Sequence, residues 1–131
     1  MGSESDGEKP TSREVQAALE QDWIASVENG LVALKARLDE DEPRIDIELV
    51  STIAEEINGL AASFGYPLLG AVAGRLSTRY RDREGVLDAH EIPIVRAFHA
   101  ALDVIVSRRH KGDGGESGEQ LLKGLDALLG E

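Results

Sequence analysis

The chain has 131 residues and a formal net charge of −11, and 41% of its residues are hydrophobic but only 4% are aromatic. This length suits one domain with a single core, and the scarcity of aromatic residues favours an aliphatic helical core over a β-sandwich. The charge argues against nucleic acid as a partner, and the absence of cysteine excludes disulfides and thiolate chemistry. Because no apolar run reaches the roughly 20 residues that span a bilayer and the acidic N-terminus is unlike a secretory signal, we expect a cytoplasmic protein without a membrane partner.

The N-terminal third predicts one long helix. Residues 1–10 are polar and rich in glycine and serine, which is typical of a disordered lead-in, and Thr11 with Glu14 has the spacing of a capping box. Apolar residues then recur at three- and four-residue steps, which predicts a helix over about 12–40 with a break near Asn29-Gly30. The apolar stripe consists of Val15, Leu19, Trp23 or Ile24, Val27, Leu31, Leu34 and Leu38.

Three helices are predicted in the middle of the chain. The first covers about 44–64, and Gly65 fits its C-terminal cap. The second covers about 68–80, just after a proline that suits a helix start. A polar loop over 81–89 follows, and Pro93 then lies in the first turn of the third helix.

The end of the chain predicts one more short helix. The stretch KGDGGESGE is a glycine-rich connector, and Ser117 with Gln120 has the spacing of a second capping box. No segment shows the alternation of a β-strand, so the sequence predicts one all-α domain over 11–131. We expect an antiparallel four-helix bundle with additional helical segments at its N-terminal and C-terminal ends.

The predicted helix over 44–64 has an outer face with unusually small side chains. At about 100° per residue, Glu55 lies at the centre of the side that points away from the core, with Ser51 one turn before it and Gly59 one turn after it. Glycine inside a helix costs roughly 1 kcal/mol relative to alanine, and the core does not require it here. We interpret this face as a docking surface. Its residues are Ser51, Thr52, Glu55, Asn58, Gly59 and Ala62.

The same stretch carries a family resemblance. The segment AEEINGLAASFGYPLL resembles the signature helix of the histidine phosphotransfer (HPt) domain, whose pattern runs roughly His-x-Leu-Lys-Gly-x-Ala and then Phe-Gly. The matching positions are Ile57 for the leucine, Gly59 for the glycine, Ala61 for the alanine and Phe64-Gly65 for the Phe-Gly pair. Tyr66-Pro67-Leu68 fits an extension of bacterial members, and the resemblance spans about residues 40–125. It implies a four-helix bundle of HPt type.

The sequence departs from this family at the residues that carry its chemistry. Glu55 occupies the position of the phospho-accepting histidine, and Asn58 occupies that of the lysine. The resemblance therefore implies a degenerate HPt domain that is not an enzyme and needs no cofactor. It implies docking of a response-regulator receiver domain or a histidine kinase, and modulation of a two-component phosphorelay. Glu55 could instead imitate phosphohistidine, although it carries about one negative charge where a phosphoryl group carries nearer two.

Alternatives to this interpretation remain. The chain could transfer phosphate through another histidine, with His99 as the first candidate and His90 and His110 behind it, or the bare face could form a homodimer rather than leave a monomer. No Glu-x-x-His pair of a bundle metal site is present at Glu55 or Glu56, so the sequence predicts no metal.

Overall fold

The computed structural model describes residues 11–130, and this part of the chain is helical and contains no β-strand. Its elements are α2 (Ser12–Leu38), α3 (Ile47–Ala61), α4 (Pro67–Tyr80), the 3-10 helix η1 (Ala89–Glu91), α5 (Ile92–Ser107) and α6 (Gly115–Leu128). The prediction of an all-α fold is confirmed. The predicted disordered lead-in, residues 1–10, lies outside the described residues.

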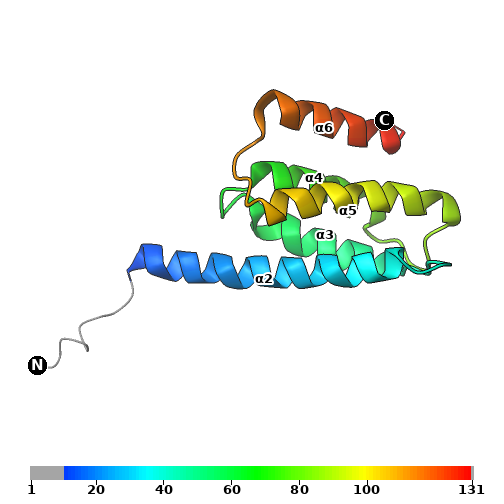
Figure 1. The fold of residues 1–131 in the computed structure, drawn as a ribbon, viewed down its shortest axis with the longest axis horizontal. Helices are drawn as coiled ribbons and strands as arrows, with labels where there is room; N and C mark the ends of the chain where they lie inside the picture. Colours follow the sequence, from blue (N-terminus) through cyan, green and yellow to red (C-terminus); the bar gives the residue numbers. More distant parts are fainter. Residues whose placement is uncertain (1–10, 131) are drawn as a thin grey trace, which may run out of the picture.

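Four of the helices enclose the core. α3 packs along α4, α2 packs against both α3 and α5, and α5 packs against α4, so the ring of contacts closes. α6 lies outside this ring against α4 and α5, and the N-terminal part of α2 extends past the other helices (Figure 1). The bundle's relation to the HPt family stays a prediction.

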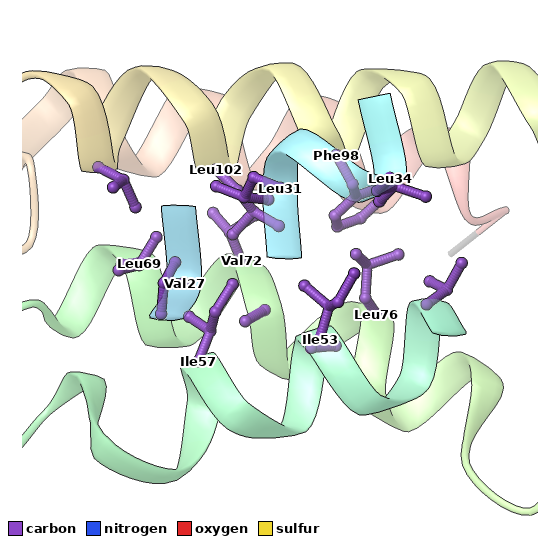
Figure 2. Close-up of a cluster of buried hydrophobic side chains, with 14 of the residues drawn as sticks. Val27, Leu31, Leu34, Ile53, Ile57, Leu69, Val72, Leu76, Phe98 and Leu102 are labelled. Atoms are coloured by element: carbon purple, nitrogen blue, oxygen red, sulfur yellow. The ribbon is translucent and has the colours of Figure 1, made fainter. Parts of the chain in front are cut away.

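The core is aliphatic, as the composition predicts. Figure 2 shows side chains from α2, α3, α4 and α5 converging on one centre. Each labelled side chain is at most 5% exposed, and burying one contributes roughly 1.5–3 kcal/mol. These residues are Val27, Leu31, Leu34, Ile53, Ile57, Leu69, Val72, Leu76, Phe98 and Leu102.

α2 begins as predicted but does not break. Thr11 Oγ1 accepts a hydrogen bond from Glu14 N at 3.1 Å, and Glu14 Oε1 accepts one from Thr11 N at 2.8 Å, which completes the capping box. The predicted break near Asn29-Gly30 is wrong. Ile53 of α3 packs over Gly30, where an added Cβ would lie 3.3 Å from Ile53 Cγ1. This packing offsets the roughly 1 kcal/mol that glycine costs inside a helix.

α3 is shorter than predicted at both ends. The segment before it pairs with the loop after α4: Ile47 N donates to Gly85 O at 2.8 Å, and Leu87 N donates to Ile45 O at 2.9 Å. These bonds hold the chain extended before Ile47, so the helix cannot begin at residue 44. At the other end Gly65 adopts a left-handed φ of +88°, as its predicted role in ending the helix requires.

α6 begins earlier than the predicted capping box. The helix starts at Gly115, whose N–H donates to Asp113 Oδ1 at 2.9 Å, and Ser117 already lies inside the helix. The prediction that Ser117 and Gln120 cap it is therefore wrong. The N-cap position is Gly114, with a left-handed φ of +78°, and the tight turn needs Gly118 because an added Cβ there would clash with Asp113 O.

A buried carboxylate joins α4 to the start of α5. Glu91 is 4% exposed and accepts hydrogen bonds from Tyr80 Oη at 2.7 Å and Arg83 Nη2 at 3.1 Å, with Arg79 Nε at 3.4 Å. Burial by itself raises the pKa of Glu91, but these hydrogen bonds and charges outweigh it and hold the pKa below its usual range. Burial and the bond to Glu91 also raise the pKa of Tyr80 to about 12.

Glu91 makes the stability of the protein sensitive to acid. Because the folded-state pKa of Glu91 is depressed, its stabilising contribution is fully present above its unfolded pKa of about 4.3 and is lost as pH falls through the folded value. Glu91→Gln should be less stable than the unaltered protein at pH 6, and the gap should narrow at pH 3. Urea unfolding at both pH values measures this, with exposed Glu116→Gln as the control. A gap that stays constant with pH would contradict the assignment.

Candidate docking face

The predicted docking residues lie together on α3. The residues Thr52, Glu55, Asn58, Gly59 and Ala62 are exposed and Ser51 is half-buried; we call this set the α3 face. The opposite side of the helix is buried in the core through Val50, Ile53, Ala54, Ile57 and Ala61. The helical period thus places the whole predicted set on the outer side of the bundle.

Glu55 lies in the open on the α3 face. Its carboxylate accepts a hydrogen bond from Ser51 Oγ at 3.3 Å, and no ion pair to it is present among residues 11–130. α3 contains Glu48, Glu55 and Glu56 but no lysine or arginine. The α3 face is therefore negative as well as bare, and Glu55 is free to meet a cation from outside.

Glycines near the α3 face serve two different purposes. Gly70 and Gly74 of α4 let α3 come close, because an added Cβ would lie 3.2 Å from Ala61 Cβ at Gly70 and 3.3 Å from Asn58 Oδ1 at Gly74. An added Cβ at Gly59 would meet nothing within 4 Å. Internal packing thus accounts for the glycines of α4 and gives no reason for Gly59.

Asn58 stands apart from the rest of the predicted set. Its side chain leans toward Gly74 and borders a groove of about 710 Å³ on the α4 side, which we call the arginine groove. This groove is lined by Asn58, Gly70, Ala71, Gly74, Arg75, Thr78, Arg79, Arg83 and Leu129. The structure therefore places Asn58 on the flank of the face, next to cations that the sequence did not link to it.

The cations of the arginine groove are already paired within the chain. Arg75 binds Asp126 of α6 through two nitrogens at 2.6 and 3.2 Å, which holds the pKa of Asp126 below its usual range. Arg79 and Arg83 share Glu91. Arg75 and Asp126 are 51 positions apart in the sequence, and Glu91 lies on a different helix from Arg79. The spacing of residues along one helix therefore could not predict these pairs. These ion pairs hold α6 and η1 against α4, and we therefore assign the arginines a structural role and not an anion-binding one.

A second groove lies between α2 and the turn that follows α3. It has a volume of about 480 Å³ and is lined by Ser12, Val15, Gln16, Leu19, Ser63 and Phe64; we call it the α2–α3 groove. Val15 and Leu19 were predicted to belong to the core stripe, but they are 43% and 56% exposed. That part of the prediction is wrong because α2 extends past the helices that would have covered them. The helical periodicity correctly placed these two residues on one apolar side of α2, but it could not show that no other helix packs against that side.

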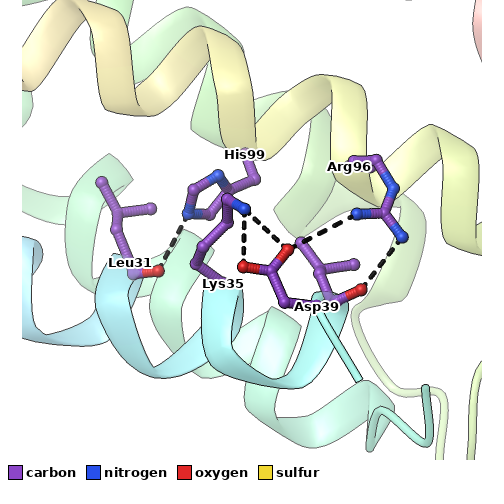
Figure 3. A network of polar contacts seen from close by, with 6 residues as sticks. Leu31, Lys35, Asp39, Arg96 and His99 are labelled. Atoms are coloured by element: carbon purple, nitrogen blue, oxygen red, sulfur yellow. Dashed lines mark hydrogen bonds and ion pairs between the residues drawn. The ribbon is translucent and has the colours of Figure 1, made fainter. Parts of the chain in front are cut away.

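The three histidines do not reach the α3 face. His99 is 6% exposed, and its Nε2 donates to Leu31 O at 2.9 Å, beside Lys35 and Asp39 (Figure 3). A carbonyl can only accept, so Nε2 carries the proton and joins α5 to α2. His90 and His110 are exposed on η1 and in the turn after α5.

Ligand atoms of Asp88, His90 and Glu91 lie within 4.8 Å of one another. Both oxygens of Glu91 already accept bonds from Tyr80, Arg79 and Arg83. That carboxylate is occupied by cations of the chain, so the cluster is accounted for by packing.

Comparisons with protein-family models, with curated proteins and with solved structures give no match. No helix within residues 11–130 is long and apolar enough to cross a membrane.

Substitution of Gly59 tests whether any contact within the protein requires glycine at this position. Gly59→Ala should raise the free energy of unfolding by up to about 1 kcal/mol, because alanine favours the helix and the new methyl group meets nothing. Gly74→Ala should raise the free energy of unfolding by less than Gly59→Ala does, or should lower it, because its methyl group would contact Asn58 too closely. Urea unfolding of both variants checks this. Destabilisation by Gly59→Ala would show that an unrecognised internal contact holds this position.

Proposed function

We propose that the protein is a signalling module of the HPt type that has lost its phospho-accepting histidine. It binds a response-regulator receiver domain or a histidine kinase through the α3 face and thereby modulates a two-component phosphorelay. The observation that carries this proposal is an exposed Glu55 with open space at Gly59 one turn later. In the family pattern that the sequence resembles, these are the positions of the acceptor and of the glycine beside it.

Docking without transfer agrees with the chemistry of the face. A carboxylate at Glu55 keeps a polar, negative group at the centre of the surface but has no ring nitrogen to accept a phosphoryl group. It is shorter than phosphohistidine and carries about half of the phosphoryl charge. We therefore favour occupation of a partner's docking surface over imitation of the phosphorylated state.

Transfer through another histidine is less well supported. The Nε2 atom of His99 already donates to Leu31 O, and its ring is buried between α2 and α5. Phosphorylation at Nε2 would remove the proton that the Leu31 carbonyl accepts. The cost of leaving that carbonyl unpaired is about 1–3 kcal/mol.

A bulky residue on the α3 face should prevent docking. Gly59→Arg fills the open space beside Glu55 and places a cation on the acidic surface, so it should reduce binding of the partner by at least about tenfold. Gly124→Arg is the matched control, because Gly124 is also an exposed helical glycine with nothing within 4 Å of an added Cβ. Binding to a panel of purified receiver domains and kinases, with circular dichroism for helicity, measures the effect. Equal binding by Gly59→Arg and the unaltered protein would show that the face is wrong.

Restoring an imidazole should restore phosphoryl transfer. The unaltered chain should acquire no acid-labile label when incubated with a phosphorylated receiver that binds it, since none of its histidines lies on the α3 face. Glu55→His should acquire such a label, and adding Asn58→Lys should strengthen it. Label on the unaltered chain that His99→Gln removes would establish the competing phosphotransfer function. Absence of label on every variant would contradict the placement of Glu55 opposite the partner's reactive group.

A further inference from the structure

The α2–α3 groove exists because α2 is longer than its neighbours. α2 has 27 residues and α3 has 15, which correspond to roughly 40 and 22 Å of helix. The first buried residue of α2 is Trp23, which donates from Nε1 to Glu56 O of α3 at 3.2 Å. Residues 12–22 therefore form an overhang of about three turns that contributes no buried side chain to the core.

This overhang carries an apolar surface toward the end of α3. Val15 and Leu19 lie one turn apart, and across the groove Phe64 is half-buried. Leu60, one turn before Phe64 on α3, is 45% exposed. Apolar side chains that line an uncovered groove are a feature of surfaces that bind another protein.

The charges around the groove indicate the chemistry of its occupant. Asp22 lies three residues beyond Leu19 on the same side of α2, and Glu56 and Glu55 follow on α3. None of these three carboxylates forms an ion pair with a cation of the described chain, although Glu56 accepts a hydrogen bond from Ser26 Oγ of α2, whereas Glu20 nearby is paired with Lys111. An apolar groove that leads onto unpaired carboxylates is complementary to an apolar surface flanked by cations.

A second copy of the chain fits this surface poorly. Each copy has a net charge of −11, and pairing through α3 would bring Glu55 and Glu56 against the same residues of the other copy. Like charges placed opposite one another are unfavourable. The charge pattern therefore favours a different protein as the occupant.

We propose that the α2–α3 groove holds an amphipathic helix of the partner, whose apolar side contacts Val15, Leu19 and Phe64 and whose Lys or Arg side chains lie over Glu55 and Glu56. The small side chains of Gly59 and Ala62 give the backbone of that helix room to cross α3. The proposal rests on the proposed function in taking the partner to be the protein that docks on the α3 face. It adds the chemistry of the docking element and a second contact region on α2.

A pair of synthetic peptides tests this chemistry on the full chain. Two fluorescein-labelled 18-residue helical peptides share one leucine stripe, and their other positions are lysine in the first and glutamate in the second. The lysine peptide should bind, and the glutamate peptide should bind at least tenfold more weakly. Val15→Ser/Leu19→Ser should weaken the lysine peptide at least tenfold. Val32→Ser/Val104→Ser is the matched control, because Val32 and Val104 are also exposed but do not line the groove, and it should leave binding unchanged.

Charge is tested separately from apolar contact. Glu55→Gln/Glu56→Gln should weaken the lysine peptide several-fold, and Glu116→Gln/Glu119→Gln on α6 should not, although both variants lose the same charge. Equal effects of the two charge variants, or of the two apolar variants, would overturn the proposal. So would a sedimentation result in which the chain is a dimer that Val15→Ser/Leu19→Ser dissociates, because the groove would then be an interface between copies.

Failure of this inference can be distinguished from failure of the proposed function. If Gly59→Arg abolishes binding of a receiver domain or kinase and Val15→Ser/Leu19→Ser leaves it unchanged, the α3 face stands and the groove is not part of the docking surface. If no receiver domain or kinase binds but the lysine peptide still discriminates among the variants, the groove stands and the signalling function falls.

Discussion

The close approach of α3 to α4 is the contact on which the rest of the structure depends. Gly70 and Gly74 give α4 a surface without side chains where Ala61 and Asn58 of α3 pack. Because α3 is held by this contact on one side and by Trp23 of α2 on the other, its remaining side is left to solvent. The core thus orients α3 so that Glu55 and Gly59 point outward.

The outward side of α3 lies between two surfaces of different chemistry. The arginine groove is lined by Asn58 and by residues of α4, and the apolar α2–α3 groove lies between α2 and the turn after α3. In the arginine groove three arginines pair with the two carboxylates of Asp126 and Glu91, and these ion pairs hold α6 and η1 in place. On the α2 side Val15 and Leu19 remain exposed, because no other part of the described chain packs over them. The asymmetry explains why we place the partner's main contacts toward α2.

Much of the fold could be predicted from local pattern. The capping box at Thr11, the apolar stripe of α2 from Trp23 onward and the cap at Gly65 depend on local spacing, and the structure confirms them. The start of α3 could not be predicted, because it is set by bonds from Ile45 and Ile47 to the loop some 40 residues later. The exposure of Val15 and Leu19 also could not be predicted, because periodicity gives the direction of a side chain and not the length of the neighbouring helices.

The candidate site shows the same division in physical terms. The α3 face is a property of one helix, so an angle of about 100° per residue was enough to assemble Ser51, Glu55, Gly59 and Ala62. The two grooves are properties of helix pairs, and they appear only when the helices are placed.

The surroundings of Glu55 in the folded bundle are what distinguish it from other exposed glutamates. An exposed glutamate in a helix is common, but here it stands above a glycine that no internal contact requires and beside an apolar surface that the described chain does not cover. The glycine lowers the stability of the helix, and the exposed apolar surface lowers the solubility of the isolated protein. The docking that we propose would use all three features together.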